Sequence, residues 1–463
     1  MDAAILFARH FAALKYEDLP PDVVEISKKQ VLDTLGVAMV GADQSGPKEV
    51  RQMVEHWGGR PESSILGTRL KVPAPNAAQV NATMAHARDY DDVHETAVMH
   101  PGVVTIIPAL AMGESVGRLS GKELIVAVAA GTDMICRLGL ATRPGVSPIQ
   151  TGWHFTSLYG YPTAALVAGR IIGLSAEQMG HAFGIAYHQC SGNGQCVVDG
   201  ALTKRLGPGF AVRGGITAAL LASRGVTGAR DSLEGQQGLF AVYHQGQYDR
   251  NELIGDLGMR FEGLNVSLKP YPCCRGIHAS IDAALKIASS HVFNPDEVRE
   301  IVIATGEANH RLLCTPFEAK IRPRNPVDAQ FSIPWGVATA LLRRGVAMED
   351  YTASAIENAQ VLSLTGKIKT VADPALNSAR GVEPVRIDIL LSNGQVLSAR
   401  VEVAKGSPMQ PMSFADCVQK FDDCMSFTGE DSGSRMSAQA VDMVANLEKL
   451  GNAAELIDLF AKE

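Results

Sequence analysis

The sequence predicts a mainly α-helical protein in which a large all-helical domain is joined to a smaller α+β domain. The chain has 463 residues, more than a single hydrophobic core usually organises, so two domains are expected. Apolar residues recur at helical spacing through most of residues 1–266, without strands between the repeats. Short alternating runs appear only after this point. We therefore expect the helical domain at 1–266 with 405–463, and the α+β domain at 267–404.

The helical domain is predicted from amphipathic segments that are rich in small residues. Residues 1–20 are expected to form an amphipathic helix, and residues 22–42 follow helical spacing up to Gly41, which can end a helix. Small side chains imply close helix–helix approach. Further Ala-rich and Gly-rich helical patterns run through 124–134, 162–173, 176–186 and 209–224, and C-terminal helices are expected at 437–449 and 453–461.

The α+β domain is predicted from strand patterns in the second half of the chain. Residues 298–304 resemble a short strand, and residues 385–391 and 396–403 both alternate apolar and polar side chains. Asn393-Gly394 stands between the last two runs. Asn-Gly between alternating runs is a strong hairpin signal, so an antiparallel hairpin is expected there.

Composition excludes several classes of protein. With 42 Lys and Arg against 49 Asp and Glu the net charge is -7, and no basic cluster exceeds pairs such as Arg343-Arg344, which argues against nucleic acid as a partner. The longest apolar run, 103–112, contains Pro108 and is shorter than the roughly 18 residues that a membrane helix needs. Because the N-terminal segment is charged, it does not resemble a signal peptide. We expect a soluble, cytoplasmic protein.

The cysteines give no sign of a metal centre. Eight are scattered along the chain, and no Cys-x-x-Cys pair occurs. This argues against a structural zinc site or an iron–sulfur cluster of ordinary spacing. The adjacent pair Cys273-Cys274 is best explained as reduced thiols that pack a turn.

The segment from Asp89 to His100 is the strongest candidate for chemistry. It holds four carboxylates and two imidazoles within twelve positions, and His100 begins the motif His-Pro-Gly. Such side chains suit a Zn, Mn or Fe site, or a metal-free acid/base site. An acidic cap at the end of a helix is the structural alternative.

Three further groups carry imidazoles or cations. His154 precedes a tightly packed helix and is either a site residue or a hydrogen-bonded core residue. Lys204 and Arg205 stand before a glycine-rich bend expected to open a helix, where they could bind an anion, best guessed as a carboxylate, or form a solvated surface pair. Lys269 and His278 flank a proline-rich segment at the domain boundary, which either holds a cation over a cleft or acts as a stiff linker.

Taken in order, several segments of the chain resemble those of the MmgE/PrpD family. The resemblance covers nearly the whole chain, and the ordered set is specific although each motif alone is not. The segments are Leu32-Asp33-Thr34-Leu35-Gly36, Asp89-Tyr90-Asp91-Asp92, His100-Pro101-Gly102, Gly152-Trp153-His154, Lys204-Arg205-Leu206, Lys269-Pro270-Tyr271-Pro272-Cys273-Cys274 and Asp328-Ala329-Gln330-Phe331-Ser332.

The resemblance implies a helical domain, a smaller α+β lid, a cleft between them and a homodimer. It implies no metal and no other cofactor. Two departures from the family pattern bear on the substrate: Gly207 stands where many members have His, and Trp335 where some carry an aromatic hydroxyl. The implied catalytic residues are Asp89, His100, His154, Lys204, Lys269 and His278, and Arg205, Arg275 and Trp335 are predicted to bind substrate.

The implied activity is that of a cofactor-free lyase of the 2-methylcitrate dehydratase type. Such an enzyme removes a proton beside a carboxylate of a small hydroxy-di- or tricarboxylate and then releases water. Fixed cations must meet the charge that develops. We predict His100 or His154 as the base and the other as the acid, with Asp89 orienting an imidazole or serving as the base itself. Decarboxylation of the cis-aconitate type, dicarboxylate epimerisation and non-catalytic carboxylate binding are the alternatives.

Overall fold

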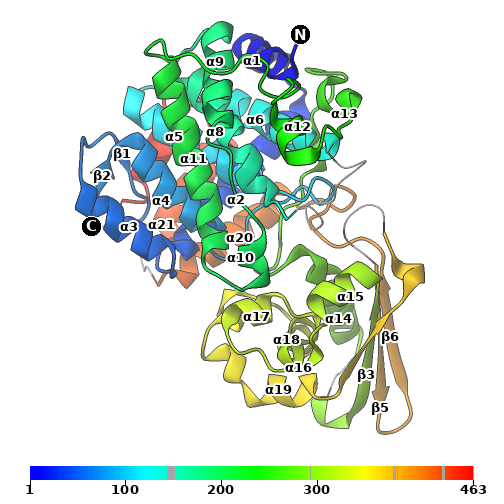
Figure 1. The fold of residues 1–463 in the computed structure, drawn as a ribbon. Helices are drawn as coiled ribbons and strands as arrows, with labels where there is room; N and C mark the ends of the chain where they lie inside the picture. The colour runs from blue at the N-terminus through cyan, green and yellow to red at the C-terminus, as the bar shows by residue number, and fades with distance from the viewer. Residues whose placement is uncertain (143–151, 292–293, 379–381, 383, 430–432, 462–463) are drawn as a thin grey trace. The chain divides into compact units, whose positions relative to one another are not determined.

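The structure is a computed structural model that describes residues 1–142, 152–291, 294–378, 382, 384–429 and 433–461. The chain forms two compact units. Unit 1 comprises Met1–Val266 with Phe414–Glu463, and unit 2 comprises Ser267–Ser413. Figure 1 shows helices throughout unit 1 and a sheet with helices in unit 2. The predicted fold class, helical with a smaller α+β part, is confirmed.

Unit 1 is built from helices that pack through small residues. A Cβ added at Gly215 of one helix would lie 2.6 Å from the Cβ of Ala164 on another, and one at Gly131 would lie 2.7 Å from Thr105. Such close approach is what the Ala-rich and Gly-rich patterns predicted. The helices are α1 Ala3–Ala13, α2 Pro21–Gly41, α3 Pro47–Trp57, α4 Ala74–His86, α5 Gly102–Val116, α6 Gly121–Ala141, α8 Phe155–Ile171, α9 Ala176–Tyr187, α10 Gln195–Val198, α11 Thr203–Ala222, α12 Leu239–His244, α13 Arg250–Ile254, α20 Phe414–Phe427, α21 Gly433–Ala445 and α22 Glu455–Asp458.

Short elements complete unit 1. A two-stranded antiparallel pair joins Ser63–Ser64 to Lys71–Val72. Single turns of 3-10 helix lie at η1 Tyr16–Asp18, η2 Glu262–Asn265 and η8 Leu447–Lys449.

Two helices begin earlier than their prolines suggested. The sequence predicted helices over 162–173 and 209–224, but α8 already begins at Phe155 and α11 at Thr203. Pro162 and Pro208 therefore lie inside helices, where each removes one backbone donor. Tertiary packing outweighs that loss: in α8 the side chains on both sides of Pro162 are buried.

The C-terminal part of unit 1 also differs from expectation. Helix α20 was not predicted, and α22 is shorter than the expected helix over 453–461. Helix α20 packs against α2, and its buried face includes Phe421 and Cys424. A Cβ at Gly36 of α2 would lie 3.0 Å from the Phe421 ring, which explains the glycine in the motif Leu-Asp-Thr-Leu-Gly.

Unit 2 is a four-stranded mixed sheet with helices against it. The strands β3 Val298–Thr305, β4 Ile368–Ala372, β5 Val385–Leu391 and β6 Val396–Val401 stand in the order β4-β3-β5-β6. Strand β3 pairs parallel to β4 and antiparallel to β5, and β5 pairs antiparallel to β6. The predicted strand at 298–304 and the Asn-Gly hairpin are both confirmed, whereas β4 was not predicted.

The helices of unit 2 supply its hydrophobic core. Helices α14 and α18 pack together, and their buried faces join the apolar residues of β3 and β5. The helices are α14 His278–Ser290, α15 Glu307–Leu313, α16 Phe317–Ile321, α17 Pro326–Gln330, α18 Ile333–Arg343 and α19 Ala359–Thr365, with 3-10 turns η3 Arg275–Ile277, η4 Pro295–Glu297, η5 Met348–Tyr351, η6 Ala355–Glu357 and η7 Pro374–Leu376.

Helix α6 is long and apolar enough to cross a membrane by length and composition alone. However, 94% of its apolar window is buried inside the protein. Core helices pass the same test, so its composition is explained by packing against its neighbours in unit 1.

Candidate active site

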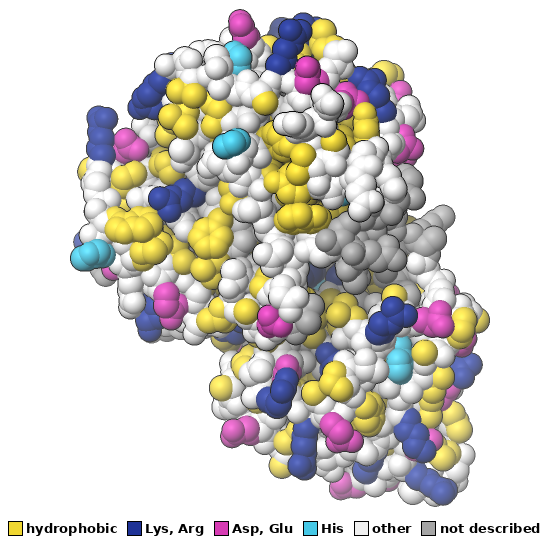
Figure 2. Space-filling view, viewed as in Figure 1, with side chains coloured by type: hydrophobic (Ala, Val, Ile, Leu, Met, Phe, Trp, Pro, Cys, Tyr) yellow, Lys and Arg dark blue, Asp and Glu magenta, His cyan; other side chains and the backbone are white. Residues whose placement is uncertain are grey.

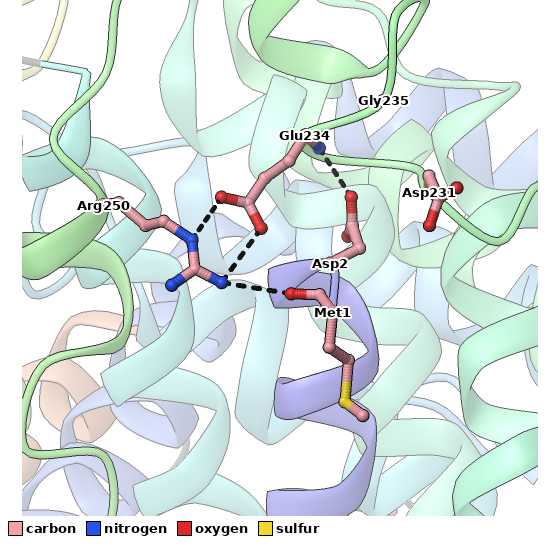
Figure 3. A pocket seen from close by; sticks show the side chains of 6 residues that line it. All are labelled: Met1, Asp2, Asp231, Glu234, Gly235 and Arg250. Atoms are coloured by element: carbon pink, nitrogen blue, oxygen red, sulfur yellow. Dashed lines mark hydrogen bonds and ion pairs between the residues drawn. The ribbon is translucent and has the colours of Figure 1, made fainter.

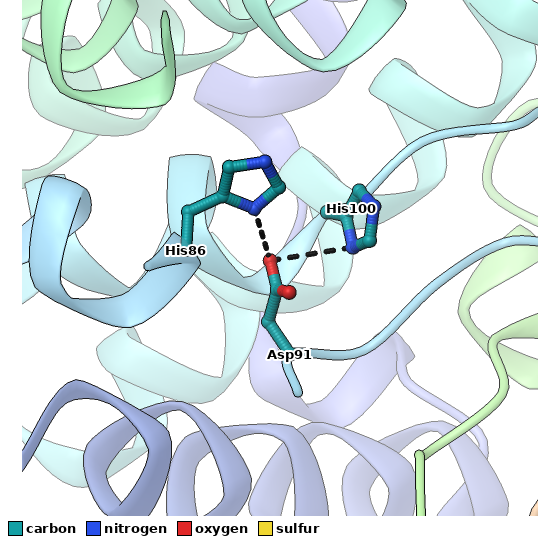
Figure 4. Close-up of side chains that lie close together, drawn as sticks. All are labelled: His86, Asp91 and His100. Carbon is teal, nitrogen blue, oxygen red and sulfur yellow. Dashed lines mark hydrogen bonds and ion pairs between the residues drawn. The ribbon is translucent and has the colours of Figure 1, made fainter. Parts of the chain in front are cut away.

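Three imidazoles and a carboxylate come together in unit 1, where α4 ends. His86 is the last residue of α4, Asp91 and His100 lie between α4 and α5, and His154 is the N-cap of α8. The ring centroid of His86 lies 4.8 Å from that of His100 and 5.7 Å from that of His154. Figure 4 shows His86 and His100 directed at the same oxygen of Asp91. Two predicted residues, His100 and His154, thus both lie next to His86, which was not predicted.

The loop between α4 and α5 is folded by its own polar groups. The backbone N–H of His94 donates to the carbonyl of Met99 at 2.8 Å, which closes a turn and brings His100 back toward Asp91. The Asp92 carboxylate then accepts from the N–H of Gly102 at 2.9 and 3.1 Å, at the start of α5. A Cβ at Gly102 would lie 3.0 Å from both Asp92 oxygens, so the glycine of His-Pro-Gly is needed for this contact.

The same loop is tied to the C-terminal segment by a buried lysine. The Lys420 ammonium of α20 donates to Asp33 Oδ1 at 2.6 Å and to the Tyr90 carbonyl at 2.8 Å. It also lies 3.8 Å from the centroid of the Tyr90 ring. Residues far apart in sequence therefore hold the loop in position.

Asp91 connects two imidazoles. Its Oδ2 lies 2.7 Å from Nδ1 of His86 and 3.3 Å from Nδ1 of His100, and Nδ1 of His100 also lies 2.7 Å from the carbonyl oxygen of Asp92. Burial alone would raise the pKa of Asp91, but the charges and hydrogen bonds of His100 and His86 hold it well below its usual value. A carboxylate and a carbonyl only accept, so each Nδ1 carries a hydrogen and each neutral ring has its lone pair on Nε2.

His86 is held neutral by its surroundings. It is 1% exposed, and burial lowers the pKa of its imidazole to about 4, against the opposing charge of Asp91. Among the described residues, its Nε2 is buried without a hydrogen-bond partner. His86 therefore adds an unprotonated nitrogen to the cluster at neutral pH.

His154 has a different kind of partner. Its Nδ1 lies 2.8 Å from Oγ of Ser157, one turn into α8. A hydroxyl can either donate or accept, so this contact does not by itself fix the tautomer. Burial, and then the neighbouring His86 and Lys204, lower the pKa of His154 well below its usual value. This imidazole is also neutral near pH 7.

Lys204 brings a positive charge beside the cluster. Its ammonium donates to Asp89 Oδ1 at 2.7 Å, and Asp89 has a left-handed backbone with φ 53°. Arg205 donates from Nη1 to the Ser45 carbonyl at 3.1 Å. The sequence placed this pair ahead of a helix, but α11 begins at Thr203, so both cations lie in its first turn. There they stand beside the positive end of the helix dipole.

Two carboxylates of the loop have different partners. The carboxylate of Asp89, which is predicted to orient an imidazole or to act as the base, pairs with Lys204. Asp91 is the carboxylate that contacts His86 and His100. Alternation along one loop cannot tell which acid faces the helix and which faces the histidines, so the sequence left this open.

The metal interpretation can be tested against these contacts. His86, Asp91 and His100 each offer a ligand atom, all within 4.8 Å of one another, and such a set suits Zn, Mn or Fe. However, Nδ1 of His100 lies at hydrogen-bond distance from the carbonyl oxygen of Asp92, an acceptor. An ion bound through this nitrogen would have to displace that hydrogen, so a metal ligand on His100 would have to be Nε2. The Nδ1 contacts themselves are those of an acid/base cluster.

The remaining predicted residues lie in unit 2. Lys269 is 1% exposed. His278 is buried, with Nδ1 3.0 Å from Nη1 of Arg275 and Nε2 3.3 Å from the Cys273 carbonyl. Arg275 also donates to the carbonyl of Lys405 at 2.7 Å. Arg275 and His278 thus form a buried polar pair at the start of α14.

Trp335 has a packing position. It is 1% exposed, lies in the hydrophobic core of unit 2, and donates from Nε1 to the Asp350 carbonyl at 3.3 Å. Its contact with substrate stays a prediction. The sequence identified the departure from the family pattern at this position but gave no information on its burial.

His86 and Ser157 were missed by sequence reasoning. His86 precedes the acidic cluster by one helical turn at the end of a small-residue helix, and that spacing could have indicated it. Ser157 lies three residues after His154, a spacing that brings side chains together at a helix start. Both signals are weak without the fold.

A surface hollow in unit 1 contains none of the predicted residues. It is lined by Met1, Asp2, Asp231, Glu234, Gly235 and Arg250. Figure 3 shows Arg250 bridging Glu234 and the Met1 carbonyl, at 2.7 and 3.0 Å. Asp2 caps α1 and accepts from the Glu234 N–H at 2.7 Å. These polar groups bind one another, and their hydrogen bonds hold the start of α1 in place.

Comparison with known proteins gives matches along nearly the whole chain. The family model of the MmgE/PrpD N-terminal domain matches residues 6–251, and that of the MmgE/PrpD C-terminal domain matches residues 271–446. A protein named cis-aconitate decarboxylase from Aspergillus terreus is 24% identical over 97% of this chain and 94% of its own length. The protein of that name from Homo sapiens is 25% identical over 90% of this chain and 86% of its own.

Proposed function

The chain belongs to the MmgE/PrpD family, and from that premise we propose that it is a lyase for a small di- or tricarboxylate that acts by proton transfer beside a carboxylate. The observation that carries the proposal is the ionised Asp91 carboxylate, shared by the imidazoles of His86 and His100. It fixes an unprotonated nitrogen on the buried ring of His86 and on the partly buried ring of His100, and it can balance the charge of one that takes up a proton. No metal or other cofactor is part of the proposal.

His100 is the proposed base. Its Nδ1 hydrogen faces the Asp92 carbonyl and Asp91, which leaves a lone pair on Nε2. When Nε2 takes a proton from carbon, the imidazolium that forms lies beside the Asp91 carboxylate. In a dehydration, the same imidazolium can return this proton to the departing hydroxyl. In a decarboxylation no proton is taken from carbon first: the carboxylate leaves as carbon dioxide, its bonding electrons stay on the substrate, and an imidazolium supplies the one proton that replaces it.

His154 and Lys204 are proposed to meet the negative charge that develops on the substrate. A neutral imidazole can donate a hydrogen bond to an enediolate-like oxygen, and an ammonium adds positive charge. Because Lys204 is paired with Asp89, part of its charge is already balanced. Arg205 in the same turn, and Lys269, Arg275 and His278 of unit 2, remain predicted substrate-site residues on the family resemblance.

Two specific reactions, dehydration and decarboxylation, fit this proposal, and each has its own support. Loss of water from a hydroxy-tricarboxylate suits a base that can hand its proton to the leaving hydroxyl. Loss of carbon dioxide is favoured by the name cis-aconitate decarboxylase that the matched relatives carry. Proton transfer to or from a carbon beside a carboxylate is common to both, and also to epimerisation.

A substrate panel tests the proposal. The purified protein is incubated with 2-methylcitrate, citrate, malate and cis-aconitate, and new alkenes are followed by proton NMR while carbon dioxide is measured separately. Dehydration gives an alkene alone, decarboxylation gives carbon dioxide, and epimerisation in D2O gives exchange at carbon with neither. Stabilisation by a ligand without turnover of any compound would favour a carboxylate-binding protein instead.

Variants then test the assigned residues. His100→Ala and His154→Ala should each lower turnover by roughly two orders of magnitude or more, because each removes a proton-transfer group or a charge-stabilising donor. His56→Ala, at an exposed position on α3, is the matched control. Near-normal turnover in both site variants would refute the assignment. Loss of activity to a chelator, with stoichiometric metal in the purified protein, would restore the metal interpretation.

A homodimer is part of the same proposal. What supports it, besides the family resemblance, is the number of apolar side chains exposed on unit 1, several of which are visible in Figure 2. Trp57, Leu202, Phe210 and Leu221 are each more than a third exposed. Light scattering at low concentration tests this, and a monomer mass would contradict it. The cytoplasmic location stays a prediction.

A further inference from the structure

Ser157 is enclosed beside His154 by two glycines from distant segments. It is 2% exposed and lies in the first turn of α8. A Cβ added at Gly192 would lie 2.4 Å from its Cβ, and one added at Gly207 would lie 2.2 Å from its Oγ. Real Cβ atoms do not approach other atoms so closely. The hydroxyl of Ser157 therefore occupies the space that any side chain at residue 207 would need.

The single hydrogen-bond partner of this hydroxyl, among the described residues, is Nδ1 of His154, at 2.8 Å. If Ser157 accepted a hydrogen from Nδ1, its own buried hydrogen would have no acceptor in the part of the chain that the structure describes. If Ser157 donates to Nδ1, the hydroxyl hydrogen and the Nδ1 lone pair are both satisfied. Since an unsatisfied buried donor is costly, donation by the hydroxyl is the stable arrangement.

Donation to Nδ1 fixes the proton of the neutral imidazole on Nε2. His154 then differs from His86 and His100, whose Nδ1 atoms face acceptors and whose Nε2 atoms hold lone pairs. The cluster would contain two rings that can take a proton and one ring that presents an N–H. Base and hydrogen-bond donor are thereby distinguished by the neighbours of each ring.

We propose that Ser157 is the positioning residue that holds His154 as an Nε2–H donor, and that Gly207 is required because any side chain there displaces the Ser157 hydroxyl. The inference rests on the proposed function for its role in turnover, but not for the tautomer itself. It also accounts for the departure at Gly207: the space beside His154 is filled by the hydroxyl from α8.

The tautomer is tested without substrate. The full-length protein is labelled with 15N-histidine, His154 is assigned with His154→Gln, and its ring nitrogens are recorded by long-range 1H–15N correlation near pH 7. The wild type should show an unprotonated Nδ1 and a protonated Nε2. Ser157→Ala and Gly207→Ala should both lose this pattern in the same way. Gly345→Ala, where nothing lies within 4 Å of the added Cβ, should leave it unchanged.

If Gly207→Ala is unstable, the double variant Ser157→Ala/Gly207→Ala still tests the proposal. With Ser157 truncated, the nearest atom of residue 157 to the added Cβ is its own Cβ at 3.5 Å, an ordinary contact. The double variant should therefore fold and give the ring signals of Ser157→Ala. A protonated Nδ1 in the wild type, or unchanged His154 signals in Gly207→Ala, would overturn the proposal.

Turnover provides the second readout. On whichever compound of the panel is converted, Ser157→Ala should lower kcat roughly tenfold with little change in KM, since one hydrogen bond that orients His154 is lost. An unchanged kcat together with an altered tautomer would overturn the catalytic role. If no compound is turned over, the proposed function fails while the ring signals still decide the tautomer.

Discussion

Asp91 is the residue on which the candidate site depends most. It is fully buried, ionised, and bonded to two imidazoles at once. A carboxylate in this position fixes ring orientation, tautomer and the charge that balances an imidazolium. None of these functions requires contact with a substrate.

Replacing Asp91 with Asn should therefore lower turnover strongly. The amide keeps the shape but loses the charge that stabilises a protonated His100, so kcat should fall by about two to four orders of magnitude. Steady-state kinetics on the converted compound measure this. Asp22→Asn, at an exposed position of α2, should leave kcat unchanged. An active Asp91→Asn enzyme would mean that Asp91 has only a packing role.

At the level of residues, the sequence indicated the neighbourhood but not the contacts. The acidic loop, His100, His154 and Lys204 were predicted, and all lie around one cluster in unit 1. The partners of Asp89 and Asp91 were not predictable, because they depend on where α4 ends and how residues 94–99 turn back. His86 was missed for the same reason.

Elements distant in the sequence hold the site loop. Helix α20 supplies Lys420, whose ammonium binds Asp33 of α2 and the Tyr90 carbonyl of the loop. The side chains of Lys420 and Asp33 are 4% and 1% exposed. Removing one partner would leave a buried charge without its counter-ion.

Lys420→Met should destabilise the protein by about 3–5 kcal/mol, because Asp33 stays buried without its ammonium. Urea unfolding of the variant and the wild type measures the difference. Lys286→Met, at an exposed position of α14, is the control and should change stability by less than about 0.5 kcal/mol. Adding Asp33→Asn to Lys420→Met should recover part of the loss. A stable Lys420→Met protein would show that the pair does not hold the loop.

Local signals determined which elements could be predicted. The hairpin of β5 and β6 was found because Asn-Gly lies between two alternating runs, and Gly394 does have a positive φ of 85°. Strand β4 is half exposed and lacks a clear alternation, so its pairing with β3 could not be read locally. The starts of α8 and α11 were misplaced because proline in a buried helix is tolerated by packing.

The two units differ in how they should respond to acid. Burial is the leading cause that lowers the pKa of His10, His86 and His244 to about 4, and it also lowers the pKa of His154 well below its usual value. All four lie in unit 1. The unfolded chain takes up these protons near pH 6.5, whereas the folded chain takes them up only near pH 4. The contribution of these histidines to the free energy of unfolding is therefore complete above pH 6.5 and is lost as pH decreases toward 4.

Three carboxyls of unit 1 act in the opposite direction. Burial raises the pKa of Asp92 to about 7, raises that of Asp133 to about 6, and also raises that of Asp2. Their contribution is present at low pH and is lost as pH rises through their pKa values. Four histidines outnumber three carboxyls. A fully buried imidazole such as His244 costs about 3 kcal/mol at pH 4, so the net effect of acid is to destabilise unit 1.

Hydrogen–deuterium exchange, corrected for the intrinsic rate, should detect this difference. Between pH 7 and pH 5 the helices of unit 1 should lose protection, while strands β3, β5 and β6 of unit 2 should keep theirs. His244→Phe should show a smaller change with pH than the wild type, because one titrating group is removed. Earlier loss of protection in the strands of unit 2 would contradict the prediction.

Because a single oxygen of Asp91 faces both His86 and His100, the proton affinity of one ring cannot be independent of the other ring. One carboxylate oxygen serves both rings, so the charge that it offers to one ring depends on the presence of the other. Replacing the His100 imidazole should therefore change the proton affinity of the buried His86 imidazole, although position 86 itself is unchanged.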